Sequence, residues 1–148
     1  MARFLYSGRT EQHKAALRRE ADALVLKESR HWRGAMYLLG YAVECRLKAQ
    51  LMEKYRADTL EELADMLNRR IRRELDLFNH NLELLFDLLD VRDKLIGRDG
   101  DQKNLRAFHR CSRWRVDWRY RPDEGNELEC RLFFDAVKQF LSFVQQNG

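Results

Sequence analysis

One long stretch of helical periodicity constrains the fold of this chain more than any other feature. Between residues 30 and 55, apolar side chains recur at steps of three and four, at Trp32, Met36, Leu39, Val43, Leu47 and Leu51. That spacing places them on one face of an amphipathic helix. The 148 residues include only one proline and seven glycines, so little interrupts such helices and a sheet with many turns is disfavoured.

Similar signals predict helices on both sides of this one. Thr10 can cap a helix that runs to about residue 29, and a rough apolar stripe follows it at Leu17, Ala21, Leu24 and Leu26. Thr59 and Glu62 have the spacing of a capping box, which would begin a helix that continues through Ile71.

The second half of the chain continues the pattern. Asn79 or Asn81 can cap a helix that ends near residue 89, a short helix fits residues 102–112, and a last one fits 127–145. We therefore expect a single all-α domain over residues 1–148. Its fold would be an up-and-down bundle of four long helices plus one short helix.

Composition narrows the class of protein. Hydrophobic residues make up 45% and charged residues 35%, which suits a soluble helical globule. No apolar run reaches the roughly 18 residues that a membrane span requires. Cys45, Cys111 and Cys130 form no CxxC pair, so we expect reduced thiols in a cytoplasmic protein, no metal site and no cofactor.

Charge is unevenly distributed along the chain. Residues 58–90 carry nine acids and four bases, whereas residues 98–121 carry eight bases and three acids. The densest part is the segment 110–121, here called the basic connector, in which five arginines alternate with Trp114, Trp118 and Tyr120. Such residues can hold phosphates and stack on bases. Alternatively, the aromatic rings anchor the segment to the bundle while the arginines stay solvated.

Two further sites are candidates for chemistry. Glu44 and Lys48 lie four residues apart, on the helix face that also carries Tyr37 and Tyr41. They form either an ordinary ion pair worth a few tenths of a kcal/mol or the polar edge of a groove. His80 begins a predicted helix and is either a structural residue or a general acid or base.

Three segments together resemble the HEPN superfamily of small helical bundles. They are residues 35–50 with Glu44 and Lys48, residues 80–85 from His80, and residues 118–120 with the Arg119–Tyr120 pair. The resemblance implies a HEPN-like bundle. It also implies that Tyr120 packs near the Glu44 edge and that Arg119 is a partner for Glu44.

The resemblance implies a catalytic motif as well. In active HEPN ribonucleases an Arg, four to six further residues and a His carry the reaction across a dimer, with Arg on the scissile phosphate and His moving the 2′-hydroxyl proton. Arg73 and His80 have six intervening residues, although Glu74 stands where the family usually has a small polar residue. Arg106 and His109 are a second pair, with only two intervening residues.

Three functions remain open from the sequence. The first is a nucleic-acid- or nucleotide-associated HEPN module of a prokaryotic defence or toxin–antitoxin system, homodimeric and paired with a nucleotidyltransferase-type partner. Its binding residues would be Glu44, Lys48, Arg113, Arg115, Arg119 and Tyr120. The second is a metal-independent endoribonuclease acting on single-stranded RNA through Arg73 and His80. The third is a structural subunit that docks a larger partner through complementary charge.

Overall fold

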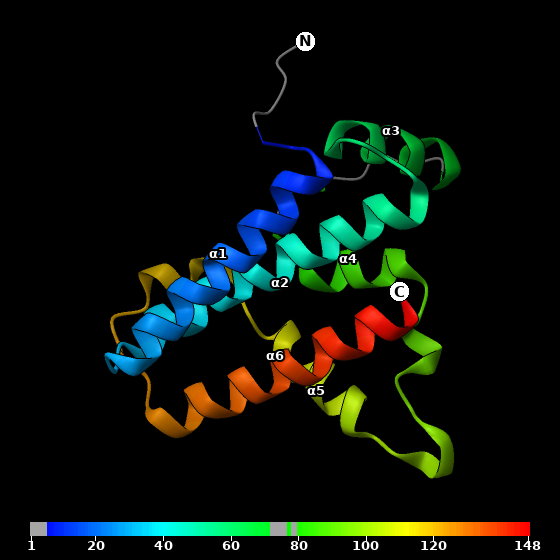
Figure 1. The fold of residues 1–148 in the computed structure, drawn as a ribbon. Helices are drawn as coiled ribbons and strands as arrows, with labels where there is room; N and C mark the ends of the chain where they lie inside the picture. The colour runs from blue at the N-terminus through cyan, green and yellow to red at the C-terminus, as the bar shows by residue number, and fades with distance from the viewer. Residues whose placement is uncertain (1–5, 72–76, 78–79) are drawn as a thin grey trace.

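The computed structural model describes residues 6–71, 77 and 80–148, and over these residues the chain is all-helical (Figure 1). An isolated β-bridge joins Gly8 to Thr59. The helices are α1 (Arg9–Glu28), α2 (Trp32–Tyr55), α3 (Leu60–Ile71), α4 (Leu82–Leu89), α5 (Lys103–Ser112) and α6 (Glu127–Asn147), with 3₁₀ turns η1 (Arg92–Lys94), η2 (Arg98–Gly100) and η3 (Val116–Tyr120).

The distribution of helix lengths differs from the expected four long helices plus one short helix. In the described ranges, α1, α2 and α6 are long, with 20, 24 and 21 residues. The other three, α3, α4 and α5, have 12, 8 and 10 residues. Local signals close α4 within two turns, because Asn81 caps its start and Asp90 adopts a left-handed conformation at its end.

Helix α2 is the centre of the molecule, and α1, α3, α4 and α6 all pack against it. A turn at residues 29–31 reverses the chain, so α1 is antiparallel to α2. Helix α6 runs parallel to α2, since Arg33 bonds to Glu129 near the start of α6 and Gln50 lies beside Gly148 at its end. The residues of the 32–51 stripe face this core as the periodicity predicts, with Met36, Leu39, Val43, Leu47 and Leu51 buried and Trp32 partly buried.

The expected apolar stripe of the first helix is correct only at Leu26, which packs against the core, whereas Ala21 is exposed. Leu17 and Leu24 are 48% and 45% exposed, whereas Ala16 and Ala23 are fully buried against the bundle. Small alanine side chains let α1 approach α2 closely, and a helix that packs on one neighbour buries only a narrow face. The helix also begins two residues earlier than expected, because its cap is Gly8 rather than Thr10.

The helix caps predicted in the middle of the chain are present. The Thr59 hydroxyl accepts a hydrogen bond from the Glu62 backbone N–H at 3.2 Å. The Glu62 carboxylate reaches back to the N–H of Asp58 at 2.9 Å. Asn81 accepts the N–H of Leu84 at 3.1 Å and is therefore the cap of α4. These bonds satisfy backbone donors that have no partner inside the helix.

Aromatic packing joins the second half of the fold. Phe86 of α4 lies 4.5 Å from Phe108 of α5 and 5.3 Å from Phe140 of α6, measured between ring centroids. Asn104 and Gln139 add a hydrogen bond between α5 and α6. Among the described helices, none combines the length and apolar character of a membrane span.

Candidate functional site

The basic connector is fixed to the bundle by Trp114. Its indole is buried and donates a hydrogen bond to the backbone carbonyl of Tyr37 at 3.1 Å. Gly40 provides the space, because a Cβ at that position would overlap the indole ring. For Trp114, therefore, the anchoring alternative is the one that the structure supports.

Trp118 is a second anchor. Its ring lies 5.9 Å from the ring of Phe133 on α6, and the guanidinium of Arg33 lies 5.4 Å from it on α2. The ring is partly buried and packs against the core. Because both tryptophans face the bundle, neither is free to stack on a bound base.

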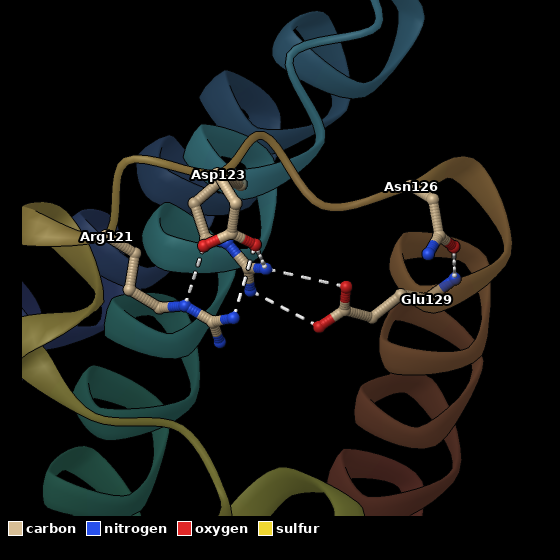
Figure 2. Close-up of polar contacts among 5 residues, drawn as sticks. Arg121, Asp123, Asn126 and Glu129 are labelled. Atoms are coloured by element: carbon tan, nitrogen blue, oxygen red, sulfur yellow. Dashed lines mark hydrogen bonds and ion pairs between the residues drawn. The ribbon is translucent and has the colours of Figure 1, made fainter.

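An ion-pair network holds the loop that follows the connector. Buried Arg33 donates to Asp123 at 2.7 Å and to Glu129 at 3.3 Å. Arg121 pairs with Asp123 at 3.0 Å. Figure 2 shows the Asp123 carboxylate between two guanidinium groups, that of Arg121 and a second one that Glu129 also approaches. Asn126 caps α6 by accepting the Glu129 N–H. The hydrogen bond from Arg33, and then that from Arg121, lowers the pKa of Asp123.

The exposed side chains of the connector include three arginines and one tyrosine. Arg113, Arg115 and Arg119 are exposed, and Tyr120 is 73% exposed. The expectation that Tyr120 packs near the Glu44 edge is therefore wrong, and the connector ring that contacts Tyr37 and Tyr41 is that of Trp114. The Arg119 guanidinium lies 4.7 Å from the Tyr120 ring. Interaction with the Tyr120 hydroxyl, and secondly with that of Tyr37, raises the pKa of Arg119.

Glu44 and Lys48 form a buried pair beside the connector. They are only 4% and 5% exposed, and Lys48 Nζ lies 3.4 Å from Glu44 Oε2. The other carboxylate oxygen lies 2.7 Å from Nδ1 of His80. Arg119 was expected to be a partner of Glu44. In the described part of the chain, the residue distant in sequence that bonds to Glu44 is His80. A buried carboxylate needs such partners, since burial disfavours its charged form.

Two tyrosines connect this pair to the connector. The Tyr37 hydroxyl donates to that of Tyr41 at 3.1 Å, and the Tyr41 ring stands edge-on to His80 with centroids 5.5 Å apart. Burial raises the pKa of Tyr41, the bond with Tyr37 adds to the rise, and Arg119 opposes it. Glu44, Lys48, His80, Tyr37 and Tyr41 are here called the Glu44 cluster, and Arg119 lies within electrostatic reach of it.

The expected catalytic pairs have different outcomes. His80 joins the Glu44 cluster, with a backbone φ of 60°, whereas Arg73 lies outside the described residues. Arg106 and His109 are exposed on α5, which packs against α4 and α6. No contact in the described ranges joins either of them to Glu44. Sequence reasoning gave no sign of the bond between Glu44 and His80, because 36 residues separate them.

No three His, Cys, Asp or Glu side chains in the described part of the chain gather closely enough to hold a metal ion. Comparison of the chain with family models, curated proteins and solved structures gave no match. The function must therefore be argued from the geometry of the connector and the Glu44 cluster.

Proposed function

We propose that this chain is a HEPN-like module that binds single-stranded RNA through its basic connector. The observation that carries the proposal is the exposure of Arg113, Arg115, Arg119 and Tyr120 on a segment that buried side chains hold in place. A rigid display of cations loses less conformational entropy on binding than a mobile loop does.

The division of labour among these side chains follows from their contacts. Arginines bind phosphate oxygens through several N–H donors, and an exposed aromatic ring stacks on a base. Of the connector's three aromatic residues, only Tyr120 is largely exposed, so it is the stacking residue. Arg121 is committed to Asp123 and Arg110 is only partly exposed, so the phosphate contacts are assigned to Arg113, Arg115 and Arg119. One nitrogen of Arg115 also donates to backbone carbonyls of the connector.

Binding of a fluorescein-labelled, 12-nucleotide mixed-sequence RNA, followed by anisotropy, tests this proposal. Tyr120→Ala should weaken binding by about fivefold or more, because base–aromatic stacking contributes about 1–3 kcal/mol. Arg113→Ala and Arg115→Ala should each flatten the dependence of log K on log salt concentration by about 0.7. Arg18→Ala, an exposed arginine on α1, is the matched control. Equal binding by all four variants would contradict an interface at the connector.

A second candidate function is metal-independent cleavage of RNA, and the contact between His80 and Glu44 favours it. With its proton on Nδ1, His80 donates to Glu44 at 2.7 Å, and Nε2 is left to accept a proton. A carboxylate behind an imidazole fixes its orientation and stabilises the imidazolium that forms. His80 would take the 2′-hydroxyl proton as the 2′ oxygen attacks phosphorus. The 5′ oxygen would leave with a proton from water, producing a 2′,3′-cyclic phosphate.

Incubation of the same RNA in EDTA tests this second candidate. His80→Asn is the informative variant, because asparagine tolerates a positive φ and can still hydrogen-bond to Glu44 but cannot accept the proton. Cleavage by wild type that His80→Asn loses and His109→Ala keeps would support it. No cleavage by wild type would reject the nuclease and leave RNA binding standing. If wild type also binds no RNA, the docking subunit is the remaining alternative.

A further inference from the structure

A groove separate from the connector lies between α1 and α6. It has a volume of about 1050 Å³, and α2 forms its floor through Leu39, Arg46, Ala49, Gln50 and Glu53. Both walls pack on α2, and Lys27 of α1 approaches the ring of Phe134 on α6 at 4.8 Å. Figure 1 shows α1 and α6 diverging from that end of the bundle.

Apolar side chains line part of the groove on both walls. Leu24 lines it from α1, and Phe134 and Leu141 line it from α6. Leu24 remains exposed because Ala16 and Ala23, rather than the leucines, make the contact with α2. Apolar side chains on both walls offer a surface that a partner can cover, at roughly 25 cal/mol for each Å² removed from water.

The charged side chains that line the groove are predominantly basic. They are the bases Arg9, Lys14, Lys27, Arg46 and Lys138, against the acids Glu20, Glu53 and Asp135. Arg46 pairs with Glu20 at 3.5 Å, and its Nε–H has no acceptor among the described residues. In the same part of the chain, Lys14 and Lys138 form no ion pair. The groove lining therefore has cations available for a negatively charged partner.

We propose that this groove binds an acidic amphipathic helix of a partner protein. The α1 wall extends from Arg9 to Lys27, which at 1.5 Å per residue is about 28 Å, a length that a helix of about 18 residues would nearly fill. A helix that places leucines at i, i+3, i+4 and i+7 in the groove would set its acidic residues against Lys14 and Lys138. The three lining carboxylates would repel phosphates and so disfavour RNA in this groove.

The proposal goes beyond RNA binding, and it shares no residue with the connector. A display library of 18-residue helices tests it, with leucine fixed at every apolar position and the polar positions drawn from Glu, Lys, Gln and Ser. Selection on the full chain should enrich glutamate over lysine at the polar positions. The strongest selected peptide, made synthetically, should bind at least about tenfold more weakly to Leu24→Asp and to Lys138→Glu. Leu128→Asp is the matched control, since Leu128 is exposed on α6 but does not line the groove.

Several outcomes would overturn the proposal. Failure to enrich any peptide, enrichment of lysine, or binding that both groove variants retain would each do so. Size-exclusion chromatography with light scattering provides a further check. A wild-type dimer that Leu24→Asp converts to a monomer would show that a second copy of this chain occupies the groove instead. Circular dichroism of each variant confirms that it is folded, so that lost binding reports on the groove. Loss of RNA binding by Tyr120→Ala is measured separately and has no bearing on these results.

Discussion

Gly40 allows two distant parts of the chain to meet. It lies on α2 under the indole of Trp114, and the absence of a side chain there lets the connector pack against the helix. The same contact brings the Trp114 N–H to the carbonyl of Tyr37, one turn earlier. A glycine inside a helix normally reduces stability by roughly 0.5–1 kcal/mol relative to alanine. Here the packing of a buried tryptophan outweighs that cost.

A pair of glycine substitutions should therefore change stability in opposite directions. Gly40→Ala should lower the free energy of unfolding by about 1–3 kcal/mol, because a methyl group would force the indole out of its place. Gly34→Ala, on the same helix, should raise it by about 0.5–1 kcal/mol, because its Cβ would make an ordinary contact with Leu26 at 3.4 Å. Urea unfolding of both variants and wild type measures the difference, and stabilisation by Gly40→Ala would contradict the packing described.

At the scale of elements, Arg33 fixes the loop that leads from η3 into α6. Its guanidinium joins Asp123 of the loop to Glu129 of the helix, beside the ring of Trp118. The loop in turn holds the end of the connector, where Arg119 and Tyr120 lie. A network that is partly exposed contributes less than a buried one, because solvent screens it.

This network predicts a pH dependence of stability. The pKa of Asp123 is lowered in the folded state, so its contribution is present above the ordinary carboxyl pKa of about 3.9 and is lost as the pH falls through the folded value. Wild type should therefore be more stable than Asp123→Asn at neutral pH, and the gap should narrow as the pH approaches about 3.

The control for this prediction is Glu124→Gln. Glu124 is the exposed neighbour of Asp123, and the described structure gives it no ion pair. Its substitution should leave the free energy of unfolding close to that of wild type across the same range. Thermal unfolding at several pH values measures all three proteins. A gap between wild type and Asp123→Asn that does not change with pH would show that the charge of Asp123 is not what stabilises the loop.

At the scale of the whole molecule, α2 organises one core to which all six described helices contribute. The three cysteines lie in different helices of this core, with Cys111 and Cys130 buried and Cys45 partly buried. Burial raises the pKa of Cys45 to about 11, that of Cys111 to about 12 and that of Cys130 to about 11. The reactive thiolate is therefore scarce at neutral pH.

The thiols should consequently report on opening of the fold. In native protein near pH 7.5, reaction with DTNB should be slow at every cysteine, because on the order of one thiol in a thousand or fewer is ionised. Cys45 should react first, since it is the least buried. In denaturant all three thiols should react rapidly. Rapid reaction of Cys111 or Cys130 in native protein would contradict the packing of α5 or α6.

Local features of the fold could be predicted from the sequence. The Thr59–Glu62 cap, the Asn81 cap and the buried residues of α2 depend on neighbours within one or two helical turns. The connector's basic character was also visible. What could not be predicted was which side of α1 faces the bundle, because its leucines and alanines fit different helix faces and only the close approach of α2 decides between them.

In the candidate site, too, local features could be predicted from the sequence and long-range contacts could not. The sequence by itself determined an all-helical chain, a Glu44–Lys48 pair on one helix face and an arginine-rich connector, because helix periodicity and charge are local properties. Only the tertiary structure decided that His80 bonds to Glu44, that Trp114 is an anchor and that Tyr120 is exposed. The contacts of His80 with Glu44 and of Trp114 with Tyr37 join residues 36 or more positions apart. Local sequence patterns cannot predict such contacts, because they reflect only neighbours along the chain.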